Sequence, residues 1–529
     1  MGKLALYIRT LRHYKGEQLF YQFYYHVRNI FRNFVNYKYL FSLYRKGAAL
    51  QFDEFIPAKT SYSANKFTFL NKSVKFSDKI DWEYADNGKL WANHLTYFDY
   101  LSQKDMSKAR GSALMYLMVD HLPKSKIAKT PYSISVRGIN WIKFISKHGI
   151  TRKTVDRYLY CQYRILLDNI AYDRMGNHLL ENGFSMLFGA YYFKGYELLN
   201  EAKIVLTQEL YEQILPDGGH YQLSPMYHQL MLNRILDGYN LLKNNKVYED
   251  EILEKLLKSC SEKMLGWLDE ITYKNGEVAC LNDSTYGVAP STKELKGYAH
   301  RLGIESKKIV LNESGYRKFS SGVMEGIIDI GNIGPDYQTD HSHSDTFNFE
   351  VVFNEMPFIV DTGISTYNRD NVRHKERSTF SHNTVRVNDV DQSEVYRTFK
   401  VGRRAKVTVL KDEINEYVAS HNGYKRMGII HQREFLVGEE SLIVNDVLEC
   451  NEESPIANAF IHFHPCCEII KVENNQVILN HGIVELKGHT DVKILDYNFA
   501  LGFSKVVKSK MLQITFDIEL STLIRRNVD

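Results

Sequence analysis

The sequence has few cysteines and no long apolar run. Six cysteines among 529 residues, with no CxxC pair, argue against a disulfide framework or zinc knuckle and favour reduced core thiols. No stretch approaches the roughly 18 apolar residues that a membrane-spanning helix needs. A secretory signal is also missing, because Arg9 and Arg12 interrupt the short apolar run at the N-terminus. As the sequence stands, we expect a cytoplasmic protein.

The first 50 residues have almost no acidic side chains. They carry nine Lys and Arg residues, thirteen Tyr and Phe residues and one acid, Glu17. A basic aromatic helix can lie on an anionic membrane surface or attract an anionic polymer. The alternative is a helix packed on its own protein with its charges in water. We expect no nucleic-acid partner, because no basic helix accompanies a nucleic-acid-binding signature.

In the rest of the chain the spacing of apolar residues changes once, near residue 310. Its length predicts two or three domains. Apolar residues recur at helical spacing in 153–170, 177–193, 201–215, 226–243 and 249–271. Beyond the expected linker at 311–315, short β-rich runs alternate with turns, as in an antiparallel sandwich. We predict a basic helical segment over 1–50, a helical domain over 51–312 and a β-sandwich over 313–529.

The densest polar cluster runs from His341 to Asp345, just before an apolar strand. In an extended chain His341, His343 and Asp345 face the same way. Asp361 and His382 follow within about forty residues, and two imidazoles with a carboxylate suit zinc. The alternative is a polar strand end that faces solvent.

Two more polar clusters stand at predicted helix starts. Asn177 and His178 begin one helix, with Glu181 close behind. Tyr227 begins another, after a Ser-Pro pair that is typical of a helix N-terminus. Each cluster alone is also what an ordinary helix cap or a half-buried aromatic side chain would give.

Taken in order, four sequence blocks resemble the bacterial heparinase II/III family. They are GNHLLENG…LFGAYYF, LPDGGHYQLSPMYHQL, HSHSDTFNFEVVFNEMPFIVDTG and RSTFSHNTVRVND. The chain is also similar to alginate lyases of related architecture. The resemblance implies an α+β multidomain fold, an incomplete (α/α) toroid followed by an antiparallel β-sandwich.

The resemblance implies a polysaccharide lyase that breaks the bond at C4 of a uronic acid by β-elimination. Such an enzyme neutralises the carboxylate, removes the C5 proton and protonates the leaving O4. By resemblance, Asn177 binds the carboxylate with His178 assisting, while Tyr227 and His341 share the acid and base roles. The implied partner is an anionic polysaccharide.

The resemblance also assigns a metal and several substrate contacts. His343, Asp361 and His382 resemble ligands of a structural divalent metal, expected to be zinc, and no organic cofactor is implied. Alginate-type members have a second catalytic tyrosine, for which Tyr367 is the only candidate between Thr362 and Ser381. Substrate contacts, with a structural role as the alternative for each, are expected from Arg137, Trp141, Glu181 and Arg377.

Two other functions stay open at this point. One is a catalytically silent polysaccharide-binding protein of a capsule or exopolysaccharide pathway, which suits the basic N-terminus. The other is a metal-dependent hydrolase that uses water activated at the predicted metal site. Degradative family members act in the periplasm or outside the cell, so the expected compartment depends on which function holds.

Overall fold

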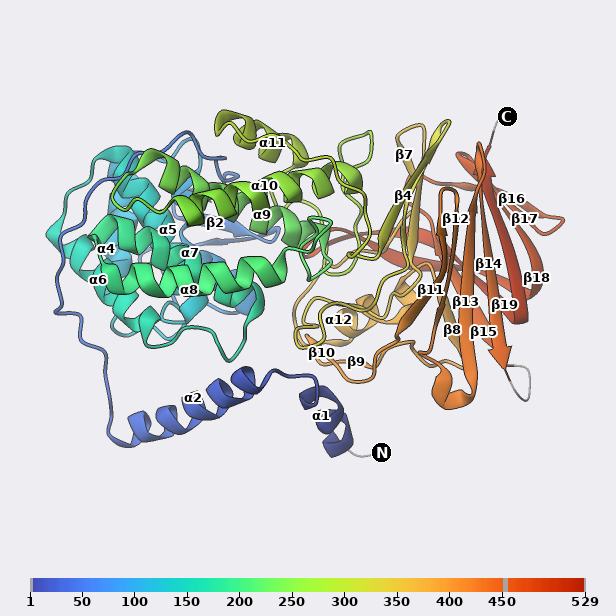
Figure 1. Cartoon of the computed structure of the whole chain (residues 1–529), viewed down its shortest axis with the longest axis horizontal. Coiled ribbons are helices and arrows are strands. Elements are labelled where there is room, and N and C mark those ends of the chain that lie inside the picture. Colours follow the sequence, from blue (N-terminus) through green and yellow to red (C-terminus); the bar gives the residue numbers. More distant parts are fainter. Residues whose placement is uncertain (1–2, 451–454, 528–529) are drawn as a thin grey trace.

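The computed structural model describes residues 3–450 and 455–527 and shows a helical half joined to a β half (Figure 1). The predicted helices between residues 153 and 271 are confirmed as α6 to α10. The helices are α1 (Lys3–Leu11), α2 (Gly16–Phe34), α3 (Lys89–Tyr97), α4 (Lys108–His121), α5 (Pro131–His148), α6 (Lys153–Leu167), α7 (Gly176–Phe193), α8 (Tyr196–Gln213), α9 (Pro225–Asn244), α10 (Glu251–Ile271) and α11 (Thr292–Arg301).

Helix α7 is the centre of the helical half. Every residue in it except His178 is buried, as expected for a helix that is apolar on all sides. It packs against α5, α8 and α9. Glycine permits one of these contacts, because a Cβ at Gly189 would lie only 2.8 Å from the ring of Tyr163. A small sheet that the sequence did not predict, β1 (Tyr62–Ser63), β2 (Lys66–Phe69) and β3 (Lys72–Lys75), flanks α3.

The β half is built from two antiparallel sheets that share one apolar core. The smaller sheet has the order β4-β5-β6-β7, with strands β4 (Tyr316–Ser321), β5 (Met324–Asp329), β6 (Phe349–Phe353) and β7 (Met356–Ile359). The larger sheet runs β11-β12-β13-β14-β19-β18-β17-β16, and β15 joins β19 to β8. Its strands are β8 (Val385–Val387), β11 (Val407–Glu413), β12 (Glu416–His421), β13 (Ile429–Val437), β14 (Ser441–Cys450), β15 (Ala457–His462), β16 (Ile469–Glu473), β17 (Gln476–Leu479), β18 (Gly482–Gly502) and β19 (Lys505–Arg526).

The loops of the two halves meet at their junction. They include the segment between α10 and α11, the approach to β6, and the stretch around α12 (Asn371–Glu376) and the short pair β9 (Val395–Tyr396) and β10 (Lys400–Val401). Figure 1 shows α12 and this pair on the side of the β half that faces the helices. Within the described residues, no helix is long and apolar enough to cross a membrane.

Candidate active site

The N-terminus of α7 forms one part of the site. Gly176 has a φ of +62°, and a Cβ there would lie 3.1 Å from the side-chain amide of Gln338, so the helix start abuts the approach to β6. Asn177 is buried, and its Oδ1 atom lacks a hydrogen-bond partner among the described residues. The ring of His178 packs against Tyr132 at 4.7 Å between centroids. An amide with an unused acceptor at this junction has donor and acceptor capacity for a ligand.

The N-terminus of α9 supplies the tyrosine. The Ser224 hydroxyl accepts a hydrogen bond from the Tyr227 backbone N–H and donates one to the backbone carbonyl of Asp283 at 2.8 Å. The Tyr227 ring lies against His341, with 3.9 Å between ring centroids, and its hydroxyl is 3.3 Å from the hydroxyl of Tyr367. The predicted tyrosine and histidine therefore meet across the junction, and the candidate second tyrosine lies beside them.

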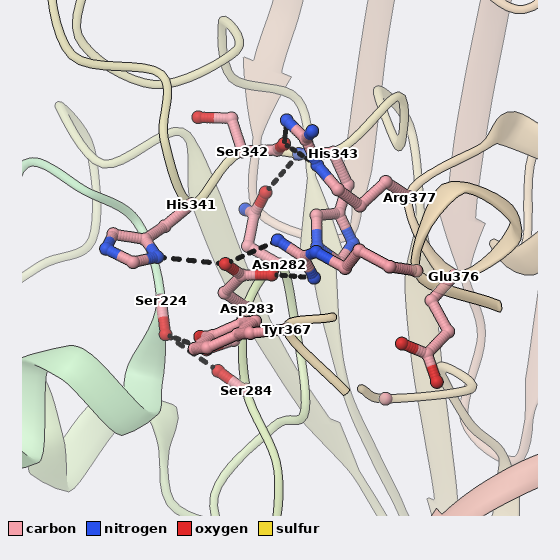
Figure 2. Close-up of polar contacts among 12 residues, drawn as sticks. Ser224, Asn282, Asp283, Ser284, His341, Ser342, His343, Tyr367, Glu376 and Arg377 are labelled. Carbon is pink, nitrogen blue, oxygen red and sulfur yellow. Dashed lines mark hydrogen bonds and ion pairs between the residues drawn. The ribbon is translucent and has the colours of Figure 1, made fainter. Parts of the chain in front are cut away.

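Asp283 organises the β-half side of the site (Figure 2). Its fully buried carboxylate contacts His341 Nδ1 at 2.9 Å, His343 Nε2 at 2.7 Å and both terminal nitrogens of Arg373 at 2.5 and 2.8 Å. Burial opposes ionisation, but the Arg373 guanidinium and the two histidines hold the pKa of Asp283 well below its usual range. Because Asp283 is ionised, it accepts a hydrogen bond from Nδ1 of His341, which leaves Nε2 on the other side of the ring.

Arg373 connects this carboxylate to the second tyrosine. Its guanidinium lies 4.8 Å from the ring centroid of Tyr367, within range of a cation–π contact. The acidic group that Arg373 binds is thus Asp283 of the same chain. Burial, with the Asp283 charge adding to it, raises the pKa of Tyr227 above its ordinary value. Tyr227 is therefore protonated in the free protein.

Asp283 itself was missed by the sequence reasoning. It lies between α10 and α11 in the run Asn282-Asp283-Ser284. The only sequence signal for a site there was that three polar residues follow a short apolar run. A related expectation is corrected. Residues 341–345 form a loop ahead of β6 and not a strand, so Asp283, and not strand alternation, brings His341 and His343 together.

The predicted metal ligands are close together but mostly bonded within the protein. His382 Nδ1 is 2.7 Å from Asp361 Oδ2, and the rings of His343 and His382 are 5.2 Å apart between centroids. His343 Nδ1 and His382 Nε2 are buried, and neither has a partner in the described part of the chain. Each of these histidines thus has a carboxylate on one ring nitrogen and a free second nitrogen. That pattern suits metal-binding histidines with outer carboxylates, although no three His, Cys, Asp or Glu side chains in the described ranges converge as a ligand set.

The four predicted substrate contacts are all buried in the protein. Arg137 and Trp141 are completely buried in α5, and the Arg137 guanidinium donates to Gln162 and to two backbone carbonyls. Arg377 is also completely buried and donates to backbone carbonyls, including that of Ser342 (Figure 2). Glu181 is buried against Arg234 at 2.9 Å. All four side chains are thus bonded or packed within the protein, and their role as substrate contacts stays a prediction.

Together the fold and site define a toroid-plus-sandwich protein with a tyrosine–histidine pair at the junction of its two halves. Two family models match the chain, Heparinase II/III N-terminus over residues 132–302 and Heparinase II/III-like, C-terminal over residues 305–516. The chain belongs to the heparinase II/III family.

Individual relatives agree with this assignment. A heparin-sulfate lyase from Bacteroides stercoris is 25% identical over 254 residues, which are 42% of this chain and 37% of that protein. The match thus spans little more than a third of that relative. The crystal structure of heparinase III has a TM-score of 0.67 at 15% identity and covers 86% of this chain and 80% of that one. A Streptomyces coelicolor A3 chondroitin AC lyase, solved in complex with chondroitin sulphate, has a TM-score of 0.53 at 9% identity, covering 84% and 75%.

Proposed function

We propose that this protein is a polysaccharide lyase that cleaves a uronic-acid-containing polysaccharide, most simply a glycosaminoglycan, by β-elimination. The observation that carries the proposal is the contact between Tyr227 and His341, with His341 fixed by Asp283. Family membership supports it, as do the heparin-sulfate lyase relative and the fold shared with heparinase III.

The helical side would bind the uronate carboxylate. The Asn177 side-chain amide donates hydrogen bonds to it and cannot be deprotonated. Burial, followed by the nearby charge of Arg174, lowers the pKa of His178 to about 3, so His178 is neutral and offers a hydrogen bond without a charge. The charges of Arg174 and Lys89 both lower the pKa of His178, so they would add positive potential beside a uronate bound there.

The acid and base roles are assigned from the protonated state of Tyr227 and from the position of His341 beside it. His341 Nε2 takes the C5 proton, and the electron pair of the C5–H bond forms the C4–C5 double bond. The C4–O4 bond breaks, and O4 takes the phenolic proton of Tyr227. Afterwards His341 returns a proton to Tyr227, whose ring it touches. This assignment needs no phenolate before the reaction, in keeping with the raised pKa of Tyr227.

We also propose a structural divalent metal, zinc being the best match, held by the free ring nitrogens of His343 and His382. Asp361 would orient His382 through its existing hydrogen bond and would not be a direct ligand. No catalytic step uses the ion. Elemental analysis of the purified native protein tests this proposal, and one equivalent of bound metal that is lost in His382→Ala is the expected result.

The lyase proposal is tested by absorbance of the unsaturated product on heparan sulfate, heparin, chondroitin sulfate, hyaluronan and alginate. Rising absorbance on any of them would establish elimination and give the substrate class. Saturated products would instead indicate hydrolysis. Binding without any product, by both the wild type and Tyr227→Phe, would favour a silent polysaccharide-binding protein.

A further inference from the structure

Helix α2 packs on the protein with its polar face. Its inward side chains contact the segment between α6 and α7, where Gln22 and Tyr25 donate to backbone carbonyls and Arg32 pairs with Asp168 at 2.6 Å. Arg28 also bonds to this segment, at 2.6 Å from Asn169 Oδ1. These contacts recur every three or four residues, so they define one face of the helix.

The opposite face of α2 is apolar and points to solvent. Phe23 and Phe34 are 69% and 88% exposed. The exposed apolar residues of α1 and α2, which we call the apolar stripe, are Leu4, Tyr7, Ile8, Leu11, Leu19, Phe20, Phe23, Tyr24, Val27, Ile30, Phe31 and Phe34. A surface helix normally has the reverse orientation. A stripe of this size marks an interaction surface.

Contacts to both halves hold the stripe in place. From α1, Arg9 makes two hydrogen bonds to Glu394, at 2.9 and 2.7 Å. At the turn between the helices, Lys15 pairs with Glu212 of α8. Figure 1 shows α1 and α2 along the outer edge of the molecule, α1 by the β half and α2 by the helical half. Because each helix is bonded through its polar side, turning the stripe inward would break these contacts.

The chemistry of the stripe fits one kind of partner best. The stripe is rich in phenylalanine, and two exposed basic residues are next to it in the chain, Arg12 between the two helices and Lys38 just after α2. Glu17 is the only acid in the first 50 residues. Apolar side chains flanked by basic ones bind a bilayer surface that contains anionic lipids. We infer that α1 and α2 form an interfacial membrane-binding element.

This element would hold the active site close to the membrane. In the turn between α1 and α2, the Tyr14 hydroxyl accepts a hydrogen bond from Lys400 at 2.7 Å, and Lys400 lies 3.5 Å from Asp340, the neighbour of His341. The turn is thus linked to the site through two side chains. If the proposed lyase activity holds, the substrate is a polysaccharide at the bilayer surface, whereas membrane binding itself does not depend on activity.

Sedimentation of the full chain with lipid vesicles tests the inference. We expect binding to phosphatidylcholine vesicles that contain phosphatidylglycerol, with weaker binding to phosphatidylcholine alone and in high salt. The double variant Phe23→Ser/Phe31→Ser should bind at least about tenfold more weakly. The matched control Ile252→Ser/Ile414→Ser removes side chains that are 83% and 91% exposed elsewhere and should bind like the wild type. Equal melting temperatures would show that all three proteins are folded.

A tryptophan probe locates the contact. The four native tryptophans are all buried, so Phe23→Trp adds the only exposed indole. Its emission should shift to shorter wavelength on the anionic vesicles and be quenched by brominated lipid. The inference is overturned if the wild type does not sediment with anionic vesicles, or if the control variant loses binding equally. A concentration-dependent dimer that the Phe23→Ser/Phe31→Ser variant abolishes, without any vesicle binding, would assign the stripe to self-association.

Discussion

The two sides of the active site hold their reacting groups by different means. On the helical side, Asn177 and Tyr227 stand at helix starts, and the local backbone with a single cap, Ser224, sets their positions. On the β-half side, His341 depends on Asp283, which is 58 residues away in sequence, and Asp283 depends on Arg373. The helical side should therefore tolerate the loss of a supporting residue, whereas the members of the Asp283 network should fail together.

Removing the reacting groups themselves should have the largest effect. Tyr227→Phe lacks the proton for O4 and His341→Ala lacks the base, so each should lower kcat by about 10²–10⁴-fold or more. Circular dichroism and melting should stay close to the wild type, because Tyr227 is only partly buried and alanine fits the space of His341. Wild-type turnover in either folded variant would show that the acid or base is assigned to the wrong residue.

Asp283→Asn tests whether the β-half side behaves as one network. The amide no longer fixes the His341 tautomer, and we expect a loss in kcat of about 10²–10⁴-fold, by analogy with the aspartate of a catalytic triad. Leaving Arg373 buried without its counter-ion should destabilise the protein by about 3–5 kcal/mol. Urea unfolding and initial rates measure the two effects. An Arg373→Met/Asp283→Asn variant that recovers stability without recovering activity would separate them, and a fully active Asp283→Asn would refute the positioning role.

The matched change on the helical side is Ser224→Ala. It removes the cap of α9 and the hydrogen bond to the Asp283 backbone, and it should cost about 2 kcal/mol in unfolding free energy. Because the helix itself still directs Tyr227, kcat should fall by less than about tenfold. A loss of activity as large as that of Asp283→Asn would remove the distinction between the two sides.

This difference also explains what could be read from the sequence. The start of α9 depends on a local cap, Ser224, and α7 is marked by a long apolar run, so Asn177, His178 and Tyr227 could be located within the fold. Asp283 and Tyr367 reach the site only through tertiary contacts, and spacing along the chain carried little information about either. The helix-to-strand change near residue 310 was predicted for the same local reason.

Residue type alone was a weak guide to the predicted substrate contacts. Arginine and tryptophan are common in polysaccharide clefts, but the same side chains fill and cross-link protein cores. Arg137 and Arg377 donate mostly to backbone carbonyls of distant segments, a role that residue type alone does not reveal. The lengths of β18 and β19, at 21 and 22 residues, were missed because polar residues interrupt their alternation.

The smallest effect on activity, with a change in stability alone, is expected from a comparison of two buried carboxylates. Asp283 is paired with the Arg373 cation, whereas Glu209 in α8 accepts a hydrogen bond from the neutral Gln213 at 2.5 Å. Burial therefore raises the pKa of Glu209 to about 7. Between the usual pKa of 4.5 and 7, folded Glu209 keeps a proton that the unfolded chain releases, so its contribution to stability falls as pH rises through this window. Glu209→Gln should therefore match the wild type near pH 4.5 and exceed it at pH 8 by about 3 kcal/mol. Urea unfolding at both pH values measures the difference. An equal difference at both would mean that Glu209 is ionised in the folded protein, and a counter-charge would then have to stabilise it as Arg373 stabilises Asp283.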